Sequence, residues 1–165
     1  MHYEDLSPES RVWIYQCDRE LTNAEVVELQ KLLAQFAQDW VAHGRDLIAH
    51  GDVYHNRFIV LFADETRNPA SGCSIDASVT FLKQLEQEFG LSLFDRMHIA
   101  FMLDGGIRLL HHDEIAGRIA SGELNEHSLV FNNLVRTREE FDRAWLVPLR
   151  TTWLAKYLKQ HVASS

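Results

Sequence analysis

The chain has 165 residues, of which 46% are hydrophobic and 24% charged, and its formal net charge is −8. This composition is typical of a globular protein and excludes a disordered chain. We expect one domain, because the length suffices for a single hydrophobic core. Within it, we expect a flexible N-terminus (residues 1–10), a core (residues 11–111) and a C-terminal extension (residues 112–165).

The acidic charge argues against nucleic acid as a partner, because nucleic-acid binding needs a basic surface that displaces counterions. No apolar run approaches the ~18 residues of a membrane-spanning helix, and the polar first residues do not resemble a secretory signal. Cys17 and Cys73 form neither a disulfide framework nor a CxxC motif. We therefore expect a cytoplasmic protein without a cofactor and without a membrane partner. The expected partner is a small molecule or a protein, and that protein can be a second copy of the chain in a homodimer.

A first strand and a first helix are predicted in the N-terminal part of the chain. The β-branched and aromatic run Arg11–Gln16 predicts the strand. Thr22 and Glu25 then form a capping box ahead of apolar residues spaced by three and four. This pattern predicts a helix that continues to about His43 and ends at Gly44.

A hairpin and a second helix are expected next. Two extended runs, residues 47–50 and 56–63, predict two strands that turn near residues 51–52. Apolar residues at helical spacing over Ile75–Phe89 predict a helix that ends at Gly90.

Two more strands, residues 97–103 and 107–111, complete the order β-α-β-β-α-β. This order predicts an α+β fold of ferredoxin-like type, in which two helices cover one face of an antiparallel sheet. A short helix (113–121), a strand (128–135) and two further helices after residue 137 are expected to form the C-terminal extension.

Cys73 lies where a loop becomes the second predicted helix, in the run Ser71-Gly72-Cys73-Ser74. The positive end of a helix dipole favours a thiolate, and exposed amides at a turn of small residues hold anions. Cys73 and Asp76 are therefore the candidate catalytic residues, and Ser71, Gly72 and Ser74 are candidate ligand contacts. The leading interpretation is structural, with a serine as the helix cap and Cys73 as a small apolar residue. Any catalytic base must come from elsewhere in the fold.

Arg57, Asn132 and Asn133 are further candidates for ligand binding. Arg57 precedes a continuous apolar strand, and the ends of strands are common places for functional sites. The two asparagines interrupt an apolar run. Their side chains either bind a ligand or satisfy the neighbouring backbone.

Two groups of histidines and acids bear on metal binding. His50, Asp52 and His55 bracket the predicted hairpin turn and form the alternative ligand set if a metal binds. Residues 111–114, with sequence HHDE, form a second group, but adjacent histidines diverge on a regular strand or helix. Neither group has a strong zinc spacing such as HExxH, so we expect no metal site.

Three segments carry a resemblance to a known family: "NRFIVLFADE", "SGCSIDASVTFLKQLEQEFGLSLFDR" and "VFNNLVRTREEFDRAWLVP". From about Arg11 to Tyr157, the chain resembles short uncharacterised bacterial proteins, mostly of the Bacteroidetes lineage, often labelled "ABC transporter ATPase". The family pattern often has a histidine after the last tryptophan, whereas Leu154 follows Trp153 here. The resemblance implies no activity, and it directs attention to four residues already named, Arg57, Cys73, Asp76 and Asn132.

The ATPase label has no support in the motifs, because GxxxxGK[ST], GxGxxG and GxSxG are all missing from the sequence. We therefore expect a non-catalytic domain that binds a small ligand or a protein partner. The alternative is a small enzyme that uses a Cys73 thiolate.

Overall fold

A computed structural model of the chain describes residues 3–164, with side chains for residues 3–159. Met1 and His2, which belong to the predicted flexible N-terminus, lie outside the described residues. The chain divides into two compact units. The first comprises Met1–Asp95 and Arg136–Phe141, and the second comprises Arg96–Val135 and Asp142–Ser165. The expected core of residues 11–111 does not coincide with either unit.

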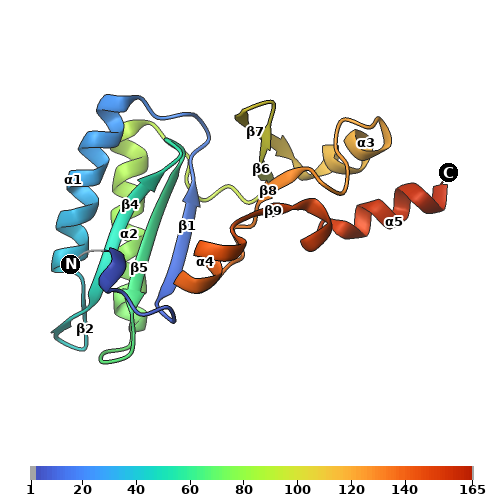
Figure 1. Cartoon of the computed structure of the whole chain (residues 1–165). Coiled ribbons are helices and arrows are strands. Elements are labelled where there is room, and N and C mark those ends of the chain that lie inside the picture. The colour runs from blue at the N-terminus through green and yellow to red at the C-terminus, as the bar shows by residue number, and fades with distance from the viewer. Residues whose placement is uncertain (1–2, 165) are drawn as a thin grey trace. The chain divides into compact units, whose positions relative to one another are not determined.

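The first unit is built on a three-stranded antiparallel sheet in the order β1-β5-β4 (Figure 1). β1 is Arg11–Gln16, β4 is Ile48–Tyr54 and β5 is Phe58–Asp64. Two long helices, α1 (Asn23–Asp39) and α2 (Gly72–Phe89), follow β1 and β5 in the chain. The capping box at Thr22 and Glu25 is formed, and Gly90 ends α2 in the left-handed conformation that favours glycine, as predicted.

All seven residues of the central strand β5 are buried. Ile59, Leu61 and Ala63 alternate along it and so face one side, where they join a cluster with residues from both helices. The helix residues in this cluster are Leu29, Leu33 and Ala37 of α1 and Leu82 and Leu85 of α2. The apolar stripes predicted from the sequence therefore cover one face of this sheet.

The other face of β5 is covered by the N-terminal residues and by residues 136–141. The Phe62 ring lies 5.3 Å from the Tyr3 ring and 5.2 Å from the Phe141 ring, between centroids. Leu6 and Ser10 are 2% and 1% exposed. Leu6, Ser10 and the Tyr3 ring therefore pack on this face of the sheet, and the flexibility expected for the N-terminus stays a prediction.

The second unit has its own four-stranded sheet, in the order β7-β6-β8-β9. Its strands are β6 (His98–Leu103), β7 (Gly106–His111), β8 (Leu129–Phe131) and β9 (Leu146–Pro148). The helices are α3 (Ile115–Ala120) and α5 (Ala155–Ser164), and α4 (Arg138–Ala144) extends from the first unit into the second. Three 3-10 helices complete the described chain: η1 (Tyr3–Asp5), η2 (His112–Glu114) and η3 (Leu149–Thr151).

The α+β class is confirmed, but the ferredoxin-like topology is not. That topology requires β6 to join the sheet of β1, β5 and β4. Instead β6 pairs with β7 on one edge and with β8 on the other. The turn between β6 and β7 has positive φ at Asp104 (52°) and Gly105 (78°), as in a type I′ turn. This turn makes the β6–β7 pairing local, and β8 occupies the remaining edge.

Several boundaries differ from the sequence prediction. The strand expected at residues 128–135 is shortened to β8, because the chain turns at Asn133 and Leu134. α1 ends at Asp39 instead of His43, and a small hairpin follows, with strands β2 (Val41–Ala42) and β3 (Arg45–Asp46). β4 continues through residues 51–52, and the turn lies at His55 and Asn56, whose φ angles are 54° and 56°. Among the described residues, no helix is long and apolar enough to cross a membrane.

Candidate functional site

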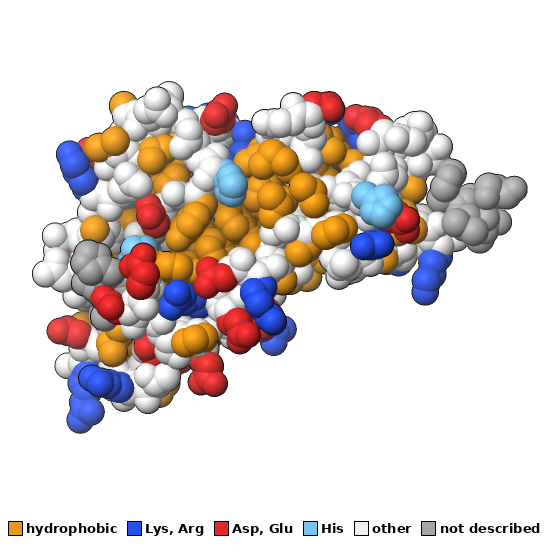
Figure 2. Space-filling view, in the orientation of Figure 1, with side chains coloured by type: hydrophobic (Ala, Val, Ile, Leu, Met, Phe, Trp, Pro, Cys, Tyr) orange, Lys and Arg blue, Asp and Glu red, His pale blue; other side chains and the backbone are white. Residues whose placement is uncertain are grey.

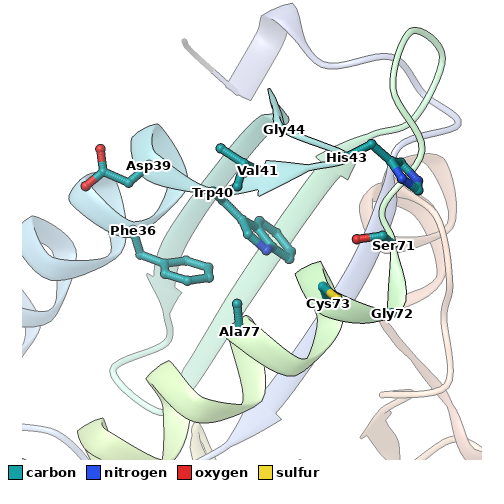
Figure 3. A pocket seen from close by; sticks show the side chains of 10 residues that line it. All are labelled: Phe36, Asp39, Trp40, Val41, His43, Gly44, Ser71, Gly72, Cys73 and Ala77. Carbon is teal, nitrogen blue, oxygen red and sulfur yellow. The ribbon is translucent and has the colours of Figure 1, made fainter.

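A pocket of about 690 Å³ lies in the first unit, where the end of α1, the β2–β3 hairpin and the first turn of α2 meet (Figure 3). Most of its lining is apolar. In the view of Figure 3, the Trp40 indole lies in the middle of the lining. The lining residues are Phe36, Asp39, Trp40, Val41, His43, Gly44, Ser71, Gly72, Cys73 and Ala77.

Trp40 is placed by the end of α1. Its backbone is extended (φ −73°, ψ 126°), so the helix stops there and the indole is directed toward α2. The indole Nε1 donates a hydrogen bond to the Ser74 carbonyl at 2.8 Å. The Phe36 ring lies 5.1 Å from the Trp40 ring and stacks on Phe81 at 4.3 Å with an interplanar angle of 5°. These contacts hold the aromatic part of the pocket in one arrangement.

The polar part of the pocket is the N-terminus of α2. Ser71 caps the helix by accepting a hydrogen bond from the Ser74 N–H at 3.1 Å, and the Ser74 Oγ accepts one from the Ser71 N–H at 3.2 Å. The first amides of a helix have no partner within the helix. Gly72 and Cys73 are the first two residues of α2, and both line the pocket.

His43 reaches the pocket through the β2–β3 hairpin. His43 and Gly44 have φ angles of 53° and 75°, which is the conformation that a two-residue hairpin turn needs. The Asn68 side chain supports this hairpin by donating to the carbonyls of Ala42 and Arg45 at 3.1 and 3.3 Å. Sequence reasoning missed His43 because it treated Gly44 as the end of a helix. The run "VAHGRD" (residues 41–46) could have indicated the hairpin, because His-Gly stands between two pairs of residues that can form short strands.

The two cysteines differ in their surroundings. Cys73 is exposed, whereas Cys17 is buried and lies in the hydrophobic core. Burial raises the pKa of the Cys17 thiol to about 12, with a further contribution from the nearby Asp18 carboxylate. Cys73 is therefore the solvent-exposed thiol of the first unit.

Other residues proposed from the sequence lie away from this lining. Ser74 is 1% exposed, and its Oγ donates to the Val41 carbonyl at 2.7 Å, so it ties the hairpin to α2. Asp76 is exposed on α2 and does not line the pocket. Arg57 lies in the turn before β5, close to the start of α1, since the Leu21 N–H donates to the neighbouring Asn56 carbonyl. The pocket is at the other end of α1, about 25 Å along a 17-residue helix.

Asn132 and Asn133 belong to the second unit and serve its local structure. The Asn132 Oδ1 accepts from the Leu134 N–H at 3.1 Å, and the Asn133 Oδ1 accepts from the Trp145 Nε1 at 2.9 Å. The Asn132 N–H donates to the Trp145 carbonyl at 2.6 Å. These bonds agree with the structural interpretation of the pair, in which the side chains satisfy neighbouring groups at the end of a strand.

The alternative metal set of His50, Asp52 and His55 is not formed. The His50 ring packs among aromatic rings, 5.8 Å from Tyr3 between centroids, and Asp52 accepts a hydrogen bond from the Gln30 side chain at 3.0 Å. The prediction assumed a turn at residues 51–52, whereas β4 is continuous there. Within the described part of the chain, the group with ligand atoms close enough for a metal is His111, His112 and Asp113.

On the face drawn in Figure 2, Lys and Arg side chains are scattered among Asp and Glu side chains.

Comparisons of the chain with protein-family models, curated proteins and solved structures find no match.

Proposed function

We propose that the first unit is a non-catalytic binding domain for a small, planar and largely apolar molecule that carries a carboxylate or similar acceptor group at one end. The observation that carries this proposal is an aromatic-lined pocket of about 690 Å³ beside a helix N-terminus. Small-molecule sites in proteins typically enclose about 300–1,000 Å³ and combine an apolar lining with few polar groups.

The apolar part of the ligand would contact mainly the half-buried Phe36 and the exposed Ala77, because Trp40 is only 3% exposed. Aromatic rings bind planar ligands by stacking and by burying apolar surface. The Phe36–Phe81 stack and the Trp40–Ser74 hydrogen bond position the two lining rings before a ligand arrives. A preorganised lining binds more tightly, because less side-chain entropy is lost on binding.

The acceptor group of the ligand would face the N–H groups of Gly72 and Cys73. α2 has 18 residues, so its dipole places a partial positive charge at these amides. The Asp39 carboxylate would repel a negatively charged group of the ligand, and in Figure 3 it lies on the side of the lining opposite to Gly72 and Cys73. This arrangement orients an amphipathic ligand with its acceptor toward α2.

The experiment is an NMR titration of ¹⁵N-labelled protein with 2-naphthoate and with its neutral analogue 2-naphthamide. We expect shifts of the Trp40 indole N–H and of the Gly72 and Cys73 amides, and tighter binding of the carboxylate. Ala77→Phe should fill the pocket and abolish these shifts. Gln84→Phe is the matched control, because it adds the same side chain at another exposed position of α2. Equal shifts in wild type and Ala77→Phe would overturn the proposal.

The alternative function is an enzyme that uses the Cys73 thiolate. One observation favours it: His43, a residue able to accept a proton, lines the same pocket as Cys73. Native protein should then incorporate one equivalent of iodoacetamide, since Cys17 is buried, and His43→Ala should slow the reaction at neutral pH. Cys73→Ser should abolish labelling of native protein. An unchanged labelling rate in His43→Ala would remove the alternative.

A further inference from the structure

Three side chains that can ligate a metal meet in the second unit, at the junction between β7 and η2. His111 is the last residue of β7, and His112 and Asp113 begin η2. Each offers one ligand atom, and the three atoms lie within 4.8 Å of one another. This group is separate in sequence from the pocket of the first unit and belongs to the other compact unit.

The two histidines lie together because the backbone changes direction between them. On a regular strand, consecutive side chains point to opposite faces. Here His111 is extended (φ −65°, ψ 141°) and His112 already belongs to a 3-10 helix. The two imidazole rings therefore stack, with centroids 4.6 Å apart and an interplanar angle of 29°. The expectation that adjacent histidines diverge is wrong at this junction.

Asp113 completes the group. Its Oδ1 lies 2.9 Å from the His112 Nδ1, and its Oδ2 lies 3.5 Å from the His111 Nδ1. In a tetrahedral zinc site with bond lengths of about 2.0–2.2 Å, neighbouring ligand atoms lie about 3.3–3.5 Å apart. Both separations lie near that range, all three ligand atoms lie within 4.8 Å of one another, and the Asp113 side chain is 73% exposed. The His111 Nδ1 accepts a hydrogen bond from the Asp113 N–H at 3.2 Å, so a metal ion would compete with this bond or use the Nε2 atom.

We propose that His111, His112 and Asp113 form a binding site for a divalent transition-metal ion, with Zn²⁺ as the ion that their donor set suits. Two imidazole nitrogens and one carboxylate oxygen are ligands of zinc sites with an open position. The net charge of −8 favours cation binding over the whole chain.

The neighbouring residues leave the group accessible to a cation. Arg118, the nearby positive charge, is held by Glu114 at 2.8 Å and by Glu123 at 2.6 Å, so its charge is compensated. Glu114 is thereby engaged and is not part of the ligand set. His98 pairs with His111 across the β6–β7 register, and their rings lie 5.2 Å apart, so another imidazole borders the site.

The test is isothermal titration of the tag-free, full-length protein with ZnCl₂. We expect one ion per chain, released by EDTA. His112→Ala and Asp113→Asn should each weaken binding at least about tenfold, the smallest effect seen when even an outer-shell partner of a metal site is lost. His127→Ala is the matched control and should bind as the wild type does, because His127 is an exposed histidine of the same unit, with 67% of its side chain exposed.

Two results would overturn the proposal. One is the absence of zinc binding by the wild-type protein at millimolar ZnCl₂. The other is equal zinc affinity in the wild type and in the His111→Ala/His112→Ala double variant, which would place the bound zinc elsewhere. Circular dichroism of each variant tests whether the second unit remains folded.

Discussion

A hydrogen bond between Trp40 and Ser74, and a second one between Ser74 and Val41, connect the end of α1 to the beginning of α2. The Trp40 indole donates to the Ser74 carbonyl at 2.8 Å, and the Ser74 Oγ donates to the carbonyl of Val41, the residue after Trp40, at 2.7 Å. Trp40 is 3% exposed and Ser74 1% exposed. The bond from the Trp40 indole is buried and the bond to Val41 is partly buried, and the two bonds hold the two sides of the pocket together.

Ser74→Ala should therefore destabilise the first unit. The substitution leaves the Val41 carbonyl without the Ser74 donor and removes the acceptor for the Ser71 N–H. Each of these hydrogen bonds is partly buried, and the loss of a hydrogen bond typically costs about 0.5–1.5 kcal/mol. Urea unfolding should show this loss, whereas Thr80→Ala, at an exposed position of the same helix, should change stability by less than about 0.5 kcal/mol. Equal stability of the two variants would contradict the role of Ser74.

Gly51→Ala should destabilise the sheet of the first unit, because β4 and α1 approach each other closely there. A Cβ at residue 51 would lie 3.0 Å from the Leu61 Cδ2 and 3.3 Å from the Leu33 Cβ. Leu33 and Leu61 are fully buried, so they have little room to move. Overpacking of a core costs about 1–3 kcal/mol.

Gly72→Ala is the matched control for this prediction. A Cβ at residue 72 would have no atom within 4 Å, and Gly72 is the first residue of α2. The variant should be as stable as the wild type, or more stable by about 0.4–1 kcal/mol through the lower entropy of its unfolded chain. Thermal unfolding of both variants gives the comparison, and a stable Gly51→Ala variant would show that the core accommodates the methyl group.

Glu25 should make stability depend on pH below its ordinary pKa of 4.5. Hydrogen bonds from Arg19, at 2.7 and 2.9 Å, and from the Thr22 N–H lower the pKa of Glu25 to about 2 in the folded protein. A lowered folded-state pKa means that the ionised carboxylate stabilises the native state. This stabilisation is complete above about pH 4.5 and is lost as the pH falls toward 2.

The measurement is the free energy of unfolding of the wild type and of Glu25→Gln between pH 7 and pH 2. Gln retains an acceptor for the Thr22 N–H and removes the ion pair. The difference between the two proteins should be constant at neutral pH and should decrease through the acidic range. Because the Arg19–Glu25 ion pair is partly exposed, added salt should also reduce the difference in unfolding free energy between the two proteins. A difference that does not change with pH would contradict the assignment.

Much of the local structure was predictable from the sequence. The first helix begins where Thr22 and Glu25 predicted, and the second ends at Gly90. The central strand was predictable too, because a continuous apolar run indicates a strand that is covered on at least one face, and β5 is buried along its whole length. The sequence also predicts a helix N-terminus at Cys73, and α2 begins at Gly72. Ser71, Gly72 and Cys73 all line the pocket.

Other features were decided by contacts between distant residues. The sequence alone determined the helices, their caps and the buried strand, because capping bonds and apolar periodicity join residues only a few positions apart. Only the tertiary structure decided that β6 pairs with β8, that Trp40 ends α1 by bonding to Ser74, and that His43 shares a pocket with Cys73. It also decided the stacking of His111 and His112, which depends on a change of backbone conformation between them. Such pairings follow from packing between segments far apart in the chain, which no local pattern encodes.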